Sequence, residues 1–167
     1  MKLNPTPPVN PPLGALHYEI GDHVVAFYPD DPFTREASAK ALRERVQAVA
    51  PDGVSEAHAA EAAGCLRMRE AFAPGTLLFA PDVDPDSIGS LKGAELWEAA
   101  EACRADLYSM STARLGIDRR RFAMLHSYSA FGWTQDEGNG AIEAAKQLAS
   151  LKSSADGKTT PAPSGGE

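Results

Sequence analysis

The sequence predicts a mainly α-helical domain of the α+β class. Four to five helices are expected around a long central helix, together with a small β-hairpin or three-stranded sheet. Three patterns support this fold class: a long amphipathic segment, two short β-prone segments around a glycine turn, and extended polar ends. The first two patterns are recognised by the side-chain period, which is about 3.6 residues in a helix and two in a strand.

The central helix is predicted from about Ala94 to Leu115. Its apolar residues recur at alternating steps of four and three, which places them on one helix face. At 1.5 Å per residue this helix would be roughly 33 Å long, enough to cross a small domain. The residues of this face are Leu96, Ala100, Cys103, Leu107 and Met110.

The β-structure is predicted between Leu16 and Tyr28, where Gly21 and Asp22 separate two segments rich in Tyr, Ile, Val and Phe. Glycine accepts the positive φ of a tight turn, and β-branched and aromatic residues suit a pleated surface. An isolated hairpin is only marginally stable. We therefore expect residues 76–80, with the sequence TLLFA, to add a third strand.

Two further helices are predicted before the central one. Asp31 followed by Pro32 is a helix start, and this helix should end near Ala50. Ser55 should cap an alanine-rich helix that ends near Phe72. The residues of the first of these helices expected to point inward are Phe33, Ala37, Leu42, Val46 and Val49.

Two helices are predicted after the central one. Asp118 can cap a short helix that ends near Ser129. Thr134 and Glu137 form a capping box, in which each residue satisfies a backbone amide of the other. This box begins a final helix with an apolar stripe formed by Ile142, Ala145, Leu148 and Leu151.

We expect one globular domain, residues 15–152, between two arms. Five of the thirteen prolines lie within residues 1–14. Proline fixes φ and lacks an amide hydrogen, so this arm should be extended. Residues 153–167 contain no apolar residue larger than alanine or proline, which favours a flexible polar tail. The sizeable apolar anchors of the first arm are Leu3, Val9 and Leu13.

The composition excludes some functional classes. A net charge of −7 and a pI near 5.1 argue against nonspecific binding to nucleic acid or to an anionic membrane. No run approaches the roughly 18 apolar residues of a membrane span, and the N-terminus lacks the apolar core of a signal peptide. We therefore expect a cytoplasmic protein, or a virion component if a phage encodes it. Cys65 and Cys103 fit helical patterns as small buried hydrophobes, with a disulfide between them left open.

An acidic loop is one candidate metal site. Asp82, Asp84 and Asp86 alternate like the first ligands of a calcium loop. However, Ser87 stands where the turn glycine is needed, and Gly93 where the bidentate glutamate belongs. The sequence therefore favours a solvated loop, and we predict neither a metal site nor a cofactor here.

Residues 112–125, TARLGIDRRRFAML, resemble the helix-turn-helix of bacterial DNA-binding regulators. The resemblance covers about 14 of the 167 residues. It implies that Arg119, Arg120 and Arg121 face phosphates or guanine edges, where the planar arginine fork makes bidentate contacts. The positions that carry it are Thr112, Leu115, Gly116, Ile117, Asp118 and Phe122. A DNA-binding adaptor is thus one alternative function. A helix, a glycine stop and a second capped helix explain the same residues without DNA.

A small enzyme or metal-binding protein is the second alternative. His17 and His23 flank the hairpin turn and could approach one another, with Asp22 or Asp30 completing a metal site. The sequence contains no zinc-protease, dithiol, nucleophile-elbow or phosphate-loop motif. No catalytic residue is therefore predicted.

An aromatic segment, residues 128–133, precedes the final helix. Its rings are expected to anchor the core; if Phe131 and Trp133 are exposed instead, they form the best partner surface. With no catalytic constellation and two polar arms, the favoured function is a non-enzymatic interaction or structural subunit of a larger bacterial or phage assembly. A virion or tail-assembly component fits the size and the arms. The expected partners are other protein chains, including copies of this one.

Overall fold

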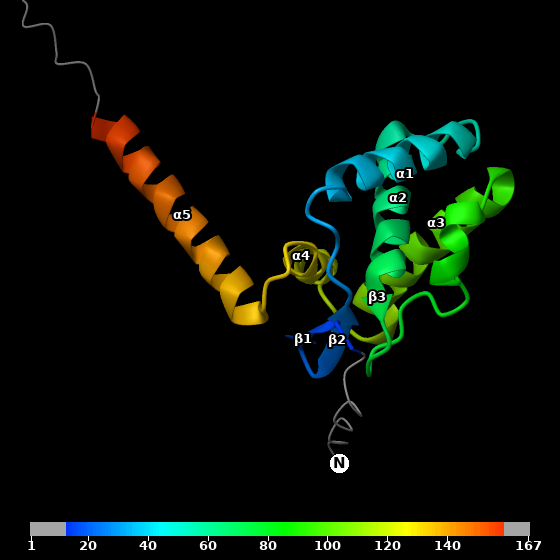
Figure 1. Ribbon diagram of the computed structural model, residues 1–167. Helices are drawn as coiled ribbons and strands as arrows, with labels where there is room; N and C mark the ends of the chain where they lie inside the picture. The colour runs from blue at the N-terminus through cyan, green and yellow to red at the C-terminus, as the bar shows by residue number, and fades with distance from the viewer. Residues whose placement is uncertain (1–12, 159–167) are drawn as a thin grey trace, which may run out of the picture. The chain divides into compact units, whose positions relative to one another are not determined.

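The computed structural model describes residues 13–158 of the chain. It contains two compact units, one up to Gln135 and one from Asp136 onward. The prediction of a mainly helical fold with a small antiparallel sheet is confirmed (Figure 1). None of the described helices is long and apolar enough to cross a membrane.

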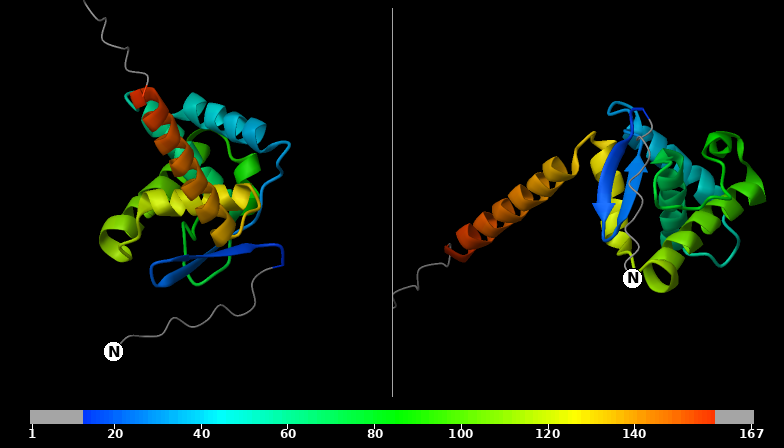
Figure 2. Two further views of the ribbon diagram at one scale, coloured as in Figure 1. Left: turned by 90° about the vertical axis from the view of Figure 1, so that its left-hand side faces the viewer. Right: turned by 90° about the horizontal axis from the view of Figure 1, so that it is seen from below.

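The sheet of the first unit has three antiparallel strands in the order β1-β2-β3. The predicted hairpin is present as β1, Leu16–Ile20, and β2, His23–Phe27. Ile20 pairs with His23 across the turn, where Gly21 has the predicted positive φ of 59°. Figure 2 shows this hairpin lying across helix α4.

The predicted third strand at residues 76–80 is wrong. The third strand, β3, is the short segment Phe72–Ala73 directly after a helix, and it pairs with the end of β2. The segment 76–80 still runs beside β2, since the Leu77 amide donates to the Val24 carbonyl at 3.3 Å. The Thr76 hydroxyl accepts a hydrogen bond from the Val24 amide and donates one to the Val24 carbonyl. A side chain therefore replaces the regular backbone ladder there.

Four α-helices complete the first unit. Helix α2 lies between its neighbours and packs against α1, α3 and α4 (Figures 1 and 2). Its buried alanines allow this close approach. The helix bounds are α1 Arg35–Val49, α2 Glu56–Ala71, α3 Gly93–Ser109 and α4 Arg119–Ala130, and a 3₁₀ helix spans Pro85–Ser90.

The predicted caps are largely correct. The Ser55 hydroxyl accepts a hydrogen bond from the His58 amide, and the Asp118 carboxylate accepts one from the Arg120 amide. Helix α1 begins later than predicted because Asp31 organises a turn over residues 32–34 before it. Phe33 lies in this turn and is 95% exposed, so the expectation that it points inward is wrong.

The predicted long helix ends early. After Ser109 the chain widens into one π-helical turn, Met110–Arg114. The amides of both Leu115 and Ile117 then donate to the Met110 carbonyl, and Gly116 takes a φ of 64°. Because both bonds close on one carbonyl, the chain turns sharply into α4.

Four aromatic rings form the centre of the core. Phe27 of β2, Phe72 of β3 and Phe79 surround Phe122 of α4, with ring centroids 5.2 to 6.5 Å from that of Phe122. All four side chains are buried. This cluster joins the sheet to α4 and so fixes the helix that carries the arginines discussed below.

The second unit contains helix α5, whose full span is Gln135–Lys158. The helix begins directly after Thr134, as predicted. It continues six residues beyond the predicted start of the tail at Ser153. Serine and alanine are tolerated inside helices, so this segment can extend the preceding periodic pattern.

Candidate functional site

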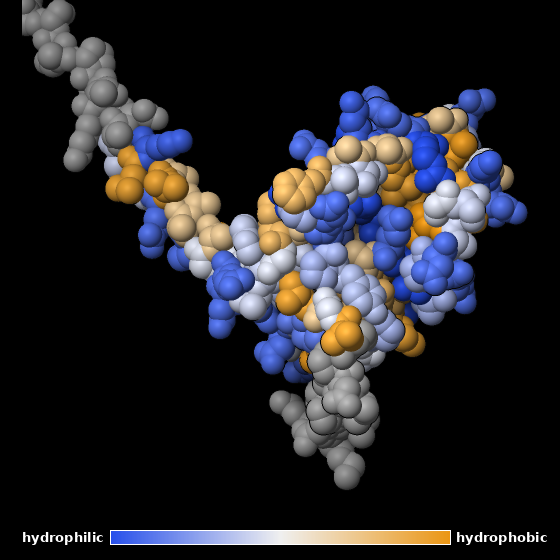
Figure 3. Space-filling view, in the orientation of Figure 1, coloured by the Kyte–Doolittle hydropathy of each residue, from blue (hydrophilic) through white to orange (hydrophobic). Residues whose placement is uncertain are grey.

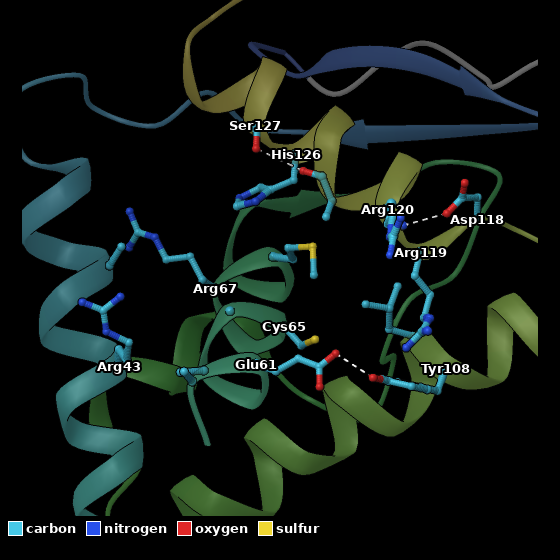
Figure 4. A pocket seen from close by; sticks show the side chains of 17 residues that line it. Arg43, Glu61, Cys65, Arg67, Tyr108, Asp118, Arg119, Arg120, His126 and Ser127 are labelled. Carbon is cyan, nitrogen blue, oxygen red and sulfur yellow. Dashed lines mark hydrogen bonds between the residues drawn. The ribbon is translucent and has the colours of Figure 1, made fainter. Parts of the chain in front are cut away.

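A pocket of about 640 Å³ opens between α1, α2, the end of α3 and the start of α4. Figure 4 shows its polar side chains entering from opposite sides, with Cys65 of α2 between them. Four arginines line the pocket: Arg43, Arg67, Arg119 and Arg120.

One wall of the pocket is a hydrogen-bonded network around Glu61 of α2. The Tyr108 hydroxyl donates to one Glu61 carboxylate oxygen at 2.7 Å, and Arg104 Nε donates to the other at 3.0 Å. Partial burial acts to raise the pKa of Glu61, but these two hydrogen bonds outweigh it and hold the pKa below its ordinary value. Arg119 stacks on Tyr108, its guanidinium carbon 3.8 Å from the ring centroid.

The opposite wall is formed by His126 of α4 and Arg67 of α2 (Figure 4). Arg67 is held in place by ion pairs with Asp30 and Glu70. Burial, with the nearby Arg67 charge, lowers the pKa of His126 to about 4, so the imidazole is neutral at neutral pH. Among the described residues, neither ring nitrogen of His126 has a hydrogen-bond partner.

Two of the pocket arginines have no acidic partner. Within residues 13–158, Arg43 and Arg120 form no ion pair and no side-chain hydrogen bond. They come from different helices, α1 and α4, and both line the pocket. Their guanidinium groups are therefore available to an anion.

The two cysteines are buried free thiols, which answers the open question of a disulfide between them. Burial raises the pKa of both Cys65 and Cys103 to about 12. We expect both to resist a thiol reagent such as Ellman's reagent in the native protein. Their thiolate fraction at pH 8 should be lower than that of an ordinary cysteine by on the order of a thousandfold. Unfolding in urea should release two reactive thiols per chain, and rapid reaction without denaturant would contradict this burial.

The helix-turn-helix resemblance is only partly reflected in the geometry. A helix, a turn at Gly116 and a second helix capped by Asp118 are present. The three arginines, however, do not form one face, because successive helix residues point about 100° apart. Arg119 stacks on Tyr108, and Arg121 does not line the pocket that Arg119 and Arg120 share. DNA binding therefore remains a prediction, and the three arginines do not form the shared surface that it would use.

The candidate metal residues are not brought together. Among the described residues, no group of three or more His, Cys, Asp or Glu side chains is placed to hold a metal ion. His17 pairs with Ala26 and His23 with Ile20, so the two histidines are not opposite each other in the ladder. Asp30 is engaged by Arg67. In the acidic loop, the Asp84 carboxylate accepts from the Asp86 amide and caps the 3₁₀ helix.

The predicted partner surface is described in part. Leu3 and Val9 lie outside the described residues, whereas Leu13 is fully exposed. The rings of Phe131 and Trp133 stack with centroids 4.6 Å apart, and Phe131 is 49% exposed. Arg35 covers the Phe131 ring at 3.9 Å from its centroid. Phe131 and Trp133 thus form neither a fully buried cluster nor an open aromatic patch.

Helix α5 carries an uncovered apolar stripe. Leu148 and Leu151 are 60% and 66% exposed. Figure 3 shows hydrophobic side chains beside hydrophilic ones near the C-terminal end of this helix. The stripe consists of Ala141, Ile142, Ala144, Ala145, Leu148, Ala149 and Leu151.

Sequence reasoning missed the pocket, whose residues come from helices far apart in the chain. Arg67 lies between the buried residues Leu66 and Met68 of α2, where an arginine is unusual. The small residues Ala60, Ala63 and Gly64 precede it. An arginine beside such small residues was the one feature of the sequence that could have indicated a pocket between the helices.

Comparisons of the chain with protein-family models, with curated proteins and with solved structures found no match.

Proposed function

We propose that this protein is a non-enzymatic interaction subunit of a larger assembly, and that α5 of one copy pairs antiparallel with α5 of a second copy. The observation that carries the proposal is the exposed apolar stripe of α5, with Leu148 and Leu151 more than half exposed. In this proposal, pairing of α5 with a second copy holds the first unit within the assembly.

The first argument is helix stability. Helices gain most of their stability in proteins from packing of an apolar face, and propensity alone contributes little. Gly138 and Gly140 each weaken the first turns of α5 by about 1 kcal/mol relative to alanine. A helix with such a start and an uncovered apolar side is stabilised when a partner covers that side.

The second argument favours a second copy as the partner. The N-terminal half of the stripe is mostly small, with Ala141, Ala144 and Ala145, and the C-terminal half carries Leu148 and Leu151. Antiparallel pairing places the leucines of one helix on the alanines of the other. This large-on-small arrangement fills space without overpacking.

Charge has the same asymmetry along α5. On the side of α5 that carries the stripe, Glu137 lies near the N-terminal end and Lys152 lies toward the C-terminal end, whereas Asp136, Glu143 and Lys146 lie on the other side. Antiparallel pairing brings opposite charges together, whereas parallel pairing brings like charges together. The pairing of two copies is therefore electrostatically favoured in one orientation.

The size of the stripe sets the expected strength. The stripe spans the eleven residues from Ala141 to Leu151, about 16 Å of helix, and a strip about 10 Å wide over this length offers on the order of 160 Å². This area is below the roughly 800 Å² per partner of a standard interface. The contact alone should therefore give a weak, concentration-dependent dimer, which further contacts within an assembly would reinforce.

Sedimentation equilibrium over about 5 to 500 μM tests the pairing. The apparent mass of the full chain should rise from 17.7 kDa toward twice that value. Leu148→Glu combined with Leu151→Glu should abolish the rise, because it places buried charges in the interface. The matched control combines Gln147→Glu with Ser150→Glu, which adds the same charge on the opposite helix face and should leave the rise intact.

Two outcomes would overturn this pairing. One is a chain that stays monomeric over the whole range, which would leave the stripe to a different protein. The other is an oligomer that persists in the Leu148 and Leu151 variant, which would locate self-association elsewhere in the chain.

A further inference from the structure

We propose that the arginine-lined pocket between α1, α2, α3 and α4 binds a small organic anion, with a carboxylate or phosphate group on an apolar body. This inference is independent of self-association, because every residue that carries it lies in the first unit.

Charge is the first argument. The chain has a net charge of −7, yet four of its sixteen basic residues line this one pocket. The two acidic side chains that line it, Glu61 and Asp118, are occupied by internal hydrogen bonds. Arg43 and Arg120 have no ion-pair partner among residues 13–158, and their planar guanidinium groups match carboxylate and phosphate oxygens.

His126 supplies the second argument. Its imidazole is half-buried at the pocket wall, and no described residue forms a hydrogen bond with its ring nitrogens. Because the imidazole lines the pocket without a partner among the described residues, its ring nitrogens can form hydrogen bonds with a ligand there. A neutral imidazole can donate one hydrogen bond and accept another, which suits a partly protonated oxyanion or a neighbouring hydroxyl.

The remaining surface explains why the anion should be organic. Between the basic walls lie apolar groups, among them Met68, Leu107 and Ala123. The volume of about 640 Å³ falls in the usual range for small-molecule sites, about 300 to 1,000 Å³. An inorganic ion would leave most of this space without contacts, whereas an aromatic or aliphatic body would fill it.

The same features disfavour a nucleic-acid backbone as the ligand. A duplex or single strand needs an extended basic surface along its length. Here the arginines enter a concave site from two sides, and Glu61 and Asp118 stand among them. Enclosure and mixed charge favour a small molecule.

Four probes test the proposal on the full chain by isothermal titration calorimetry and by amide chemical-shift changes in NMR. Benzoate and phenyl phosphate carry the two anionic groups on an aromatic body, benzamide is the neutral counterpart, and inorganic phosphate lacks the body. We expect benzoate or phenyl phosphate to bind at millimolar concentration or below. Benzamide and inorganic phosphate should bind at least about tenfold more weakly, since hydrogen bonds to charged groups and the apolar contacts are each lost. The tighter of the two anions identifies the preferred head group.

Charge-neutralising variants locate the site. Arg43→Gln and Arg120→Gln should each weaken binding of the preferred anion by about tenfold or more. Arg121→Gln is the matched control: it removes the same charge from the same helix, but Arg121 does not line the pocket. Its affinity should change less than about twofold. Circular dichroism of each variant checks that the helical fold is retained.

The proposal is overturned if benzamide binds as tightly as benzoate and phenyl phosphate, or if no probe binds. Equal weakening by Arg120→Gln and Arg121→Gln would also overturn it, because anions would then respond to general surface charge. Equal affinity for inorganic phosphate and phenyl phosphate would reject the apolar part of the site.

Discussion

Replacing Phe122 with alanine is expected to lower the free energy of unfolding by about 3 to 5 kcal/mol, the usual cost of removing a buried aromatic ring. Phe122 is completely buried, and its ring meets those of Phe27, Phe72 and Phe79 at centroid distances of 5.5, 6.5 and 5.2 Å. The loss combines apolar transfer energy, a cavity and the edge-on ring contacts. Urea denaturation followed by circular dichroism measures it.

Phe33→Ala is the matched control for this variant. It removes the same ring from a position that is 95% exposed, so the free energy of unfolding should change by less than about 0.5 kcal/mol. If both variants lost similar stability, or if Phe122→Ala lost less than about 1 kcal/mol, the four-ring core described above would be incorrect.

Acidification should destabilise the protein through His126. The pKa of His126 is about 4 in the folded protein, below the value near 6.5 expected in the unfolded chain. Between these values the unfolded chain binds the proton more readily. The contribution of His126 is therefore fully present above pH 6.5 and is lost as the pH falls toward 4. Of the loss between pH 7.5 and 4.5, on the order of 2 to 3 kcal/mol should come from this residue.

His126→Gln isolates this contribution from the carboxylates that also titrate in acid. The two charged groups that act on the imidazole, Arg67 and Asp30, are unchanged in this variant. The stability difference between pH 7.5 and 4.5, measured by urea denaturation, should shrink by on the order of 2 to 3 kcal/mol. An undiminished pH dependence in His126→Gln would show that the imidazole is not buried as described.

Local signals were the reliable part of the sequence. Ser55 and Asp118 cap α2 and α4 as expected, because a cap depends on a few adjacent residues. The hairpin around Gly21 is equally local. The third strand was misplaced because an apolar run such as residues 76–80 indicates burial but not strand pairing. The residues that pair with β2 are the ones that directly follow the end of α2. The central helix was drawn too long because its apolar period continues through Met110, where the backbone widens.

The pocket could not be read from the chain in the same way. Arg43, Arg67 and Arg120 belong to three helices, and only Arg67, beside the small residues of α2, gave a local signal. Their convergence depends on how α1, α2 and α4 pack, which no local pattern specifies. The partial burial of His126 likewise results from its position beside Phe27. The apolar stripe of α5 was visible in the sequence, but its exposure was not.

The four-ring core also bears on how the chain is synthesised. Phe27, Phe72 and Phe79 are made before Phe122, the ring that all three contact. A nascent chain that has not yet reached α4 therefore exposes these rings together, and partly folded chains with exposed apolar surface are the ones that aggregate. Translation arrested before Phe122 should thus yield a product that depends on chaperones, whereas a product extending through Gln135 contains every ring of the cluster.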